Sequence, residues 1–319
     1  MRSAVLCAVL SLCSLLLPWG AQAVTPEEAS KISTAFGNRV EAATILGGND
    51  SASGGVYDFS ANKANINIFK IAGHGDVTAP MSLGESGLSW NPILGGSIGY
   101  IQCESNLNFA PYIGNRIQNH SFFSSLGGGG RLWFTKELST SASATLLYTH
   151  FTNTITSQTS GIPAAADSLL DWNADTITAI PSVDIRYRIG LTKDLQLEFT
   201  SLYSHFATWQ IDNSSPDLNV SGASDTWANK LDLDQRLPWK LLGYNLHTGG
   251  FFSVMNLFGS AADGFDASAI YTGNIRLVVG DIPGIWKAWF VNWLGLGASY
   301  FWAGSFSGWS YGADVKFVF

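Results

Sequence analysis

The chain ends on the stretch Trp309–Phe319, WSYGADVKFVF, and this stretch decides the fold. Every second residue from Trp309 to Phe319 is apolar, whereas the residues between them are mostly small or polar. A period of two is typical of a β-strand with one apolar and one largely polar face. Chain termini usually fray, so a chain that stops within a strand needs a neighbouring strand to hold its end. A closed sheet, in which the last strand pairs with the first, meets this need.

The composition indicates that the protein contacts lipid. Only 13% of the residues are charged, against roughly 25% in soluble domains, and another 13% are aromatic. The most apolar late stretch, 289–304, carries Gly295, Gly297 and Ser299 at strand spacing and does not resemble a membrane-spanning helix. Because only helices and closed barrels satisfy every backbone group in hydrocarbon, we expect an all-β transmembrane fold, an antiparallel up-and-down outer-membrane β-barrel.

The first 23 residues predict export. Arg2 precedes an uncharged apolar run, 3–17, and the segment closes on Ala-Gln-Ala23. This order is typical of a secretory signal peptide, here 1–23, that is cleaved between Ala23 and Val24. We therefore expect a location in the outer membrane of a Gram-negative bacterium.

Cysteine count and charge exclude several function classes. Cys7 and Cys13 leave with the signal peptide, and Cys103 alone can form neither an internal disulfide nor a thiolate metal cluster. The formal net charge is −7 and there is no basic tract, which argues against nucleic acid as a partner. We expect no metal and no cofactor.

Alternation continues towards the N-terminus and predicts 12 strands in all. The three weakest are expected near 64–71, 77–83 and 94–103. A turn is expected near Arg236–Lys240, and the other connections on its side are mostly short, except 280–288. Connections at the opposite ends are longer and polar, near 104–120, 153–175 and 212–224. Short periplasmic turns and longer outer loops are the pattern of outer-membrane barrels.

Two hairpins share one design. Arg131–Leu138, RLWFTKEL, resembles Arg188–Leu195, RIGLTKDL, and each is followed by a strand with the pattern Leu-Tyr-x-His-Phe. Strand parity places the two histidines, His150 and His205, on the lipid-facing side, in an outer aromatic girdle. A metal-binding or catalytic role for these histidines is the alternative.

A helix is expected before the barrel. The segment 24–50 begins with Thr25-Pro26 and two glutamates, which is a typical helix start, and apolar residues then recur at helical spacing up to about Leu46. This helix could lie inside the barrel (51–319) as a plug. A periplasmic stub or a linker is the alternative.

An N-terminal helix before a 12-stranded barrel that ends in aromatic-x-aromatic resembles the translocator unit of autotransporters. Only about 40 residues separate Ala23 from the first expected strand, too few for a secreted passenger domain. The stretch Leu237–Phe252, LPWKLLGYNLHTGGFF, and the hairpin Gly295–Phe319 therefore make the chain more similar to the solitary outer-membrane autotransporter-like β-barrels. The resemblance implies the fold and the outer-membrane location, and no activity.

Charged residues of both signs are expected on the inner face. They could line a water-filled pore, pair across the lumen, or bind the N-terminal helix. A 12-stranded barrel is too wide for side chains alone to fill, so we expect a plugged lumen, with a solute path as the second interpretation. The candidates are Arg131, Asp184, Arg186, Arg188, Glu198, Lys230, Asp232, Asp234, Arg236, Arg276, Asp314 and Lys316.

A surface lipid hydrolase, of phospholipase or deacylase type, is the main alternative function. A barrel of that kind would carry a His-x-Ser arrangement, but His120 is adjacent to Ser121, and His150-Phe-Thr152 offers only a threonine. Sequence shows no base, nucleophile and orienting group together. We therefore expect a structural or pore-forming envelope protein that is not an enzyme, with an adhesin-like barrel as a further alternative.

The last strand also resembles an assembly signal. Tyr311, Val315, Phe317 and Phe319 form its apolar series, and such an ending resembles the one read by the β-barrel assembly machinery. The expected partners are this machinery, periplasmic chaperones, outer-membrane lipids and lipopolysaccharide.

Overall fold

The structure is a computed structural model, and most of the barrel is described. It describes residues 44–46, 54–59, 64–77, 80–106, 116–156, 171–215, 219–280, 291–304 and 306–317. The predicted signal peptide, its cleavage site at Ala23 and Val24, Phe319 and most of the predicted N-terminal helix lie outside these ranges.

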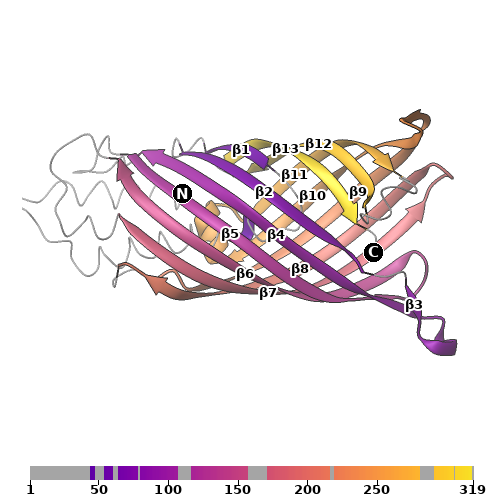
Figure 1. The fold of residues 1–319 in the computed structure, drawn as a ribbon, viewed down its shortest axis with the longest axis horizontal. Coiled ribbons are helices and arrows are strands. Elements are labelled where there is room, and N and C mark those ends of the chain that lie inside the picture. The colour runs from indigo at the N-terminus through magenta and orange to yellow at the C-terminus, as the bar shows by residue number, and fades with distance from the viewer. Residues whose placement is uncertain are drawn as a thin grey trace, which may run out of the picture.

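Long antiparallel strands dominate the described chain (Figure 1). Short helical elements accompany them, among them a helical turn at residues 44–46, a 3₁₀ turn at Gly84–Ser86 and the helix α4 at Ser260–Phe265. The strands are β1 (Gly54–Phe59), β2 (Ala64–Asp76), β3 (Met81–Ser82), β4 (Ser89–Asn106), β5 (Arg116–Trp133), β6 (Leu138–Thr156), β7 (Trp172–Gly190), β8 (Leu195–Asn213), β9 (Gly222–Leu241), β10 (Tyr244–Gly259), β11 (Ala269–Gly280), β12 (Val291–Ala303) and β13 (Phe306–Phe317).

The sheet closes on itself. Consecutive strands pair from β4 to β13, β13 pairs with β1, β1 with β2, and β2 with β4. β3 adds only two residues to the edge of β4, so the other twelve described strands form the ring. The seam joins Gly54 to Tyr311 and Asp58 to Ser307. The predicted up-and-down barrel of 12 strands is confirmed, and the last strand is held on both sides.

One predicted strand, 77–83, is wrong as a wall strand. The first strand of the ring is β1, and Met81–Ser82 instead pairs with Ser89 and Trp90 in a hairpin that extends beyond the barrel wall (Figure 1). Gly84 and Gly87, at φ 70° and 73°, close this hairpin in a conformation that favours glycine. Local turn formation therefore outweighs the weak alternation that predicted a strand.

The predicted turn near Arg236–Lys240 is also displaced. β9 continues to Leu241, and the chain turns at Leu242 and Gly243, which have φ 54° and 87°. Two successive positive φ values match the twist of a two-residue hairpin. Pro238 falls within β9, where the register shifts opposite Asn245 and His247, and such an irregularity tolerates a residue without a backbone N–H.

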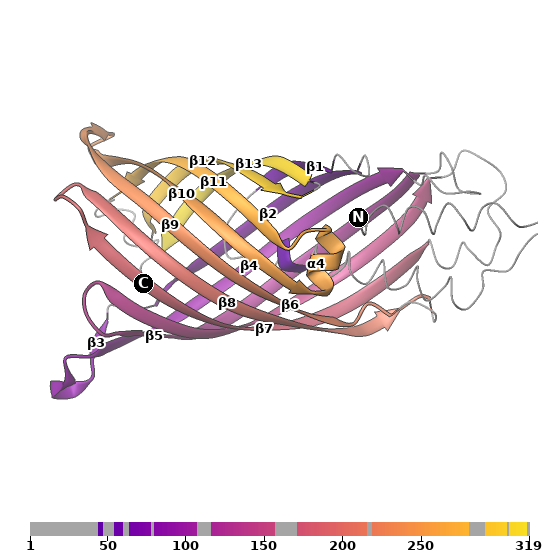
Figure 2. The ribbon, with the colours of Figure 1, turned by 180° about the vertical axis from the view of Figure 1, so that it is seen from behind.

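The repeated hairpins have the same turn. Thr135 Oγ1 accepts hydrogen bonds from the backbone N–H groups of Glu137 and Leu138, both at 3.0 Å. Thr192 Oγ1 accepts the equivalent bonds from Asp194 and Leu195, at 3.2 and 3.0 Å. Together with the β9–β10 turn they define one end of the barrel, the turn end. The opposite end, which carries α4 (Figure 2), is the loop end.

Alternation along each strand separates two faces. Large apolar side chains are exposed around the outside of the ring, among them Leu126, Leu146, Ile275 and Leu296 at 62–73%. Their neighbours in sequence point inward. The outer wall is therefore an apolar band of the kind that meets lipid. In the part of the chain that the structure describes, no helix is long and apolar enough to cross a membrane.

Candidate functional site: the barrel lumen

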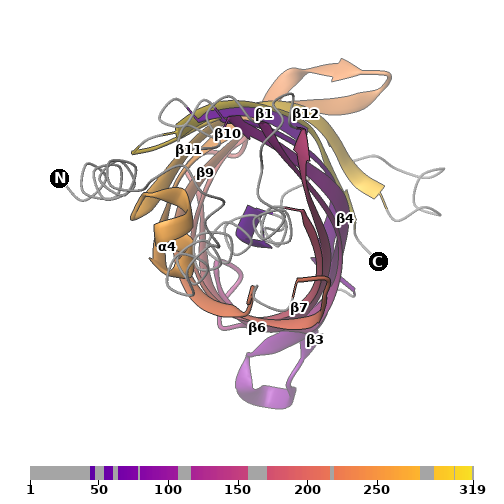
Figure 3. The ribbon, with the colours of Figure 1, turned by 90° about the vertical axis from the view of Figure 1, so that its left-hand side faces the viewer.

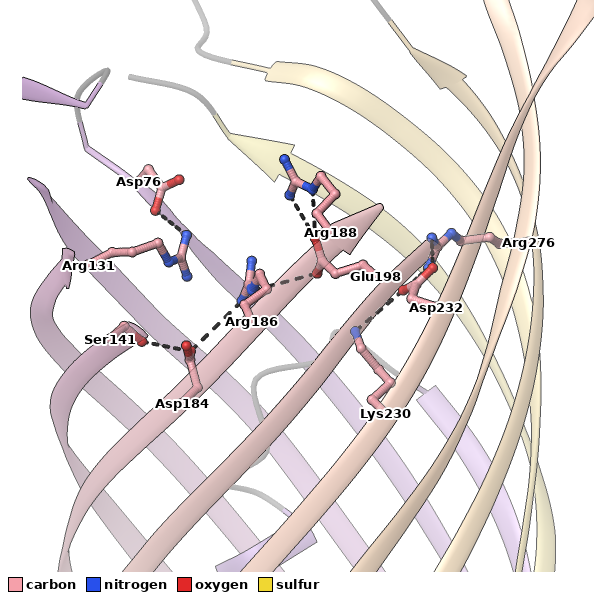
Figure 4. Close-up of polar contacts among 10 residues, drawn as sticks. All are labelled: Asp76, Arg131, Ser141, Asp184, Arg186, Arg188, Glu198, Lys230, Asp232 and Arg276. Atoms are coloured by element: carbon pink, nitrogen blue, oxygen red, sulfur yellow. Dashed lines mark hydrogen bonds and ion pairs between the residues drawn. The ribbon is translucent and has the colours of Figure 1, made fainter. Parts of the chain in front are cut away.

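The inner wall carries a zone of charged side chains, whose polar contacts Figure 4 shows. Arg131 lies near the turn-end terminus of β5, and Arg186 near that of β7, so this zone is in the half nearest the turn end. Val183, Ile185 and Tyr187 of β7 are exposed on the outer face, while Asp184 and Arg186 between them point inward. The same alternation places Arg131 of β5 and Glu198 of β8 on the inner wall. Most of the charged candidates therefore line one zone of the lumen, and their functional role stays a prediction.

Arg131 anchors the first group of this zone. Its side chain is only 4% exposed, and Nη1 donates to Asp76 Oδ1 at 2.6 Å. Its guanidinium carbon lies 5.9 Å from the centre of the Trp133 ring, within the range of a cation–π contact. Trp133 in turn donates to Asn91 Oδ1 at 2.7 Å. The ion pair between Arg131 and Asp76 therefore joins β5 to β2 across β4.

The second group joins β6, β7 and β8. Arg188 donates to Glu198 Oε2 through Nε at 3.0 Å and Nη2 at 2.7 Å. Arg186 lies between two acids, 3.6 Å from Glu198 and 3.9 Å from Asp184. Ser141 Oγ donates to Asp184 Oδ2 at 2.6 Å.

The third group joins β9 to β11. Arg276 donates to both carboxylate oxygens of Asp232, with Nη1 at 3.0 Å from Oδ2. Lys230 Nζ lies 3.4 Å from Asp232 and 5.2 Å from the centre of the Phe251 ring. Gly249 is the residue of β10 opposite Arg276, so no side chain on β10 blocks the arginine from reaching across.

Two further candidates lie nearer the β9–β10 turn. Asp234 Oδ2 lies 3.1 Å from His247 Nδ1. Arg236 is opposite His247 in register and is exposed. Paired charges of opposite sign thus tie neighbouring and next-neighbour strands together, whereas an open charged pore would leave such groups facing water.

The loop-end half of the lumen contains an apolar cluster among buried serine and threonine side chains such as Thr149 and Thr178. This buried cluster combines inward side chains of six strands with Ala261 of α4. The cluster includes Ile45, 1% exposed, on a helical turn formed by residues 44–46. Figure 3 shows this turn inside the ring of strands. The strand members are Ile68, Ile101, Phe123, Leu147, Ile180 and Phe206.

The remaining predicted residues lie along β13 or outside the described chain. Asp314 is opposite Gly295, and Lys316 is opposite Trp293. Of the predicted assembly signal, Tyr311 is 67% exposed on the outer face, and Val315 and Phe317 belong to the paired part of β13 by backbone register. Ala23, Val24 and Phe319 fall outside the described residues, as do most of the outer connections on which an adhesin role depends.

Sequence reasoning missed several members of the lumen groups, among them the hydrogen-bonding partners Asp76 and Ser141. Asp76 ends β2 on the same face as the buried Lys70, so counting by two from Lys70 would have found it. Ser141 has no such signal because its partner Asp184 is 43 residues away in the chain.

The outer face carries clustered aromatic rings, and a girdle at the membrane boundary stays a prediction. Tyr271 stacks on Trp302 with ring centres 5.6 Å apart, and Tyr300 contacts Trp302 and Trp309 at 5.8 and 4.9 Å. His150 and His205 are also on this face, each beside an aspartate. Within the described ranges, no three or more His, Cys, Asp or Glu residues are grouped so that they could hold a metal ion.

Comparisons with known proteins agree with this architecture. The family model for solitary outer-membrane autotransporter β-barrel domains matches residues 40–311. Among solved structures, the β-domain of the Bordetella autotransporter BrkA superposes with a TM-score of 0.56 at 16% identity, covering 84% of this chain and 100% of that one. The transport unit of the autotransporter AIDA-I from Escherichia coli gives 0.52 at 11% identity, covering 84% and 88%. At these identities the likeness shows the fold alone. Curated proteins gave no match.

Proposed function

We propose that this chain, which belongs to the solitary outer-membrane autotransporter β-barrel family, acts in the outer membrane as a structural barrel with a closed lumen. Two layers support this proposal. The apolar cluster lies in the loop-end half, and the paired charges lie in the turn-end half. An apolar constriction excludes hydrated ions, and paired charges offer little free charge to attract them.

The observation that carries the proposal is the burial of Ile45. A residue before the first strand has a side chain only 1% exposed, and it belongs to one cluster with side chains of β2, β4, β5, β6, β7 and β8. A short helical turn inside the ring therefore fills space that a 12-stranded wall cannot fill with its own side chains. We propose that the segment 24–50, to which Ile45 belongs, is the plug.

Export and assembly complete the proposal. The segment 1–23 would direct export and leave a mature chain that begins at Val24. The terminal strand would be read by the β-barrel assembly machinery after delivery by periplasmic chaperones. In the membrane, the exposed apolar band would contact lipids and, at the outer leaflet, lipopolysaccharide.

Conductance in planar bilayers tests the closed lumen. The mature chain is expected to give little steady conductance. A variant without residues 24–50 is expected to conduct steadily, because removing Ile45 leaves a gap in the apolar cluster that closes the lumen. The matched control has the full length of the mature chain, with Ile45 and Leu46 both replaced by Ser. This variant keeps the segment 24–50 but weakens its apolar contacts with the strands. It should therefore conduct intermittently. Equal conductance of the mature chain and the deletion variant would exclude the plug.

A further inference from the structure

The expectation that the protein is not an enzyme remains a prediction, and one group of outer-face side chains bears on it. His150 Nδ1 lies 2.7 Å from Asp175 Oδ1, and the other ring nitrogen, Nε2, lies 3.3 Å from Thr152 Oγ1. Tyr148 Oη donates to the same Asp175 oxygen at 2.8 Å. Three side chains of β6 and one of β7 thus form a continuous hydrogen-bonded chain.

The hydrogen-bond partners of His150 determine which of its two ring nitrogens carries the proton. A carboxylate can only accept, so His150 Nδ1 carries the proton that bonds to Asp175. In the neutral ring Nε2 is then an acceptor, and it faces the threonine hydroxyl. Hydroxyl, imidazole and carboxylate in this sequence are the arrangement that activates an oxygen nucleophile. The 3.3 Å contact is longer than in a reacting complex, as is common before substrate binds.

The second hairpin provides a comparison within the chain. Tyr203 and His205 both bond to Asp225 Oδ1, with His205 Nδ1 at 2.8 Å. The position that corresponds to Thr152 is Ala207. A shared structural role, such as joining neighbouring strands at the membrane boundary, explains Tyr, His and Asp in both places. It does not explain why only the first hairpin places a hydroxyl, that of Thr152, beside the second ring nitrogen of its histidine.

A donor for a developing oxyanion is also at hand. His120 of β5 is the cross-strand partner of Thr152, and such partners have Cβ atoms about 4.5–5.5 Å apart. The Tyr100 hydroxyl contacts His120 Nδ1, and the two rings stack. When Tyr100 donates this bond, the neutral His120 ring carries its proton on Nε2, which can donate to a negative oxygen beside Thr152.

We propose that Thr152, His150 and Asp175 form a hydrolytic site for acyl esters of membrane lipids. The group faces outward on the wall that meets lipid, beside the exposed rings of Tyr148, Tyr100 and Phe122. Aromatic rings of this kind are typical of the headgroup boundary. Lipid ester bonds and water meet at this depth. The site lies outside the lumen, so it is independent of the plug.

The reaction balances without any further reagent. Thr152 Oγ1 attacks the ester carbonyl carbon while His150 Nε2 takes the hydroxyl proton. The tetrahedral oxyanion collapses, the carbon–oxygen bond to the lipid alcohol breaks, and His150 returns the proton to that alcohol. Water then attacks the acyl-threonine and gives its proton to His150, which passes it to Thr152 Oγ1 as the fatty acid leaves. Asp175 is a positioning residue that holds the ring and its tautomer.

The test uses the mature chain in detergent micelles, with p-nitrophenyl laurate and a dilauroyl phosphatidylethanolamine as probes. Release of nitrophenol and of fatty acid is expected from the native protein. Thr152→Ala should reduce release to background, whereas Thr152→Ser should retain it. His150→Gln should slow it by about 10²–10⁴-fold. Asp175→Asn should lower kcat over a similar range with KM unchanged, since it disturbs the histidine and not lipid binding.

The second hairpin supplies the control. His205→Gln removes the equivalent bond where no hydroxyl is present, and its rate should stay within about twofold of the native rate. A lipophilic fluorophosphonate should label Thr152, located by peptide mass spectrometry, and should not label Thr152→Ala. Heat-modifiable gel mobility confirms that each variant is folded. Unchanged release in a folded Thr152→Ala variant, or absence of both release and label in the native protein, overturns the proposal.

Discussion

The bidentate pair between Asp232 and Arg276 offers the sharpest test of the inner wall. The two side chains are 12% and 9% exposed, and Lys230 lies 3.4 Å from the same carboxylate. Asp232→Asn removes the negative charge and leaves two cations close together. Breaking a buried pair by removing one partner costs roughly 3–5 kcal/mol. Because the lumen is partly polar, we expect the lower end of this range, about 3 kcal/mol.

Equilibrium unfolding by guanidinium chloride in detergent micelles measures this cost. With a slope of roughly 2–6 kcal/mol per molar, a loss of about 3 kcal/mol lowers the midpoint by about 0.5–1.5 M. Asp194→Asn is the matched control, since its contact with Lys193 spans 4.0 Å and the lysine is 91% exposed. The midpoint of this control should not move measurably.

A double variant distinguishes the loss of the ion pair from the cost of leaving one buried charge unpaired. Asp232→Asn combined with Arg276→Met removes the buried acid and the buried arginine together, and most of the lost stability should return. A single Asp232→Asn variant with a native midpoint would refute the view that paired charges stabilise the inner wall. The same conclusion would follow if Asp194→Asn shifted the midpoint as much as Asp232→Asn.

Two further predictions concern assembly. Gly249→Val should sharply lower the yield of heat-modifiable barrel, because a Cβ at Gly249 would lie 2.3 Å from the Leu233 carbonyl oxygen; Gly128→Ala, whose Cβ would meet nothing nearer than 3.5 Å, should assemble normally, and equal yields would contradict the steric argument. Deletion of Phe319 should lower the membrane yield of folded barrel, measured by outer-membrane fractionation and gel mobility, because it shortens the predicted assembly signal. Phe319→Tyr keeps an aromatic terminus and should behave as the native chain does, and a native yield in the deletion variant would remove Phe319 from that signal.

Local periodicity made much of the wall predictable. Alternation over β5 to β9 distinguishes the inner from the outer face without knowledge of any neighbour, because successive side chains of a strand point to opposite sides. The turns after Trp133 and Gly190 were predictable for a similar reason, since the Thr-Lys-acid sequence forms its own hydrogen bonds. β1 was missed because its six residues begin with Gly54-Gly55 and carry little alternation. It is a strand because closure places β13 and β2 on either side of it.

The sequence by itself therefore determined the class of fold and the side on which most side chains lie, since both follow from a period of two. The number of wall strands agreed because the missed β1 takes the place of the strand wrongly predicted at 77–83. Only the tertiary structure decided which of those side chains meet. Asp76 reaches Arg131 across β4, Arg276 reaches Asp232 across β10, and Ile45 lies among side chains of six strands. The physical reason is register: closure of the ring fixes how far each strand slides past the next, and residues 40 or more positions apart become neighbours only when that offset is set.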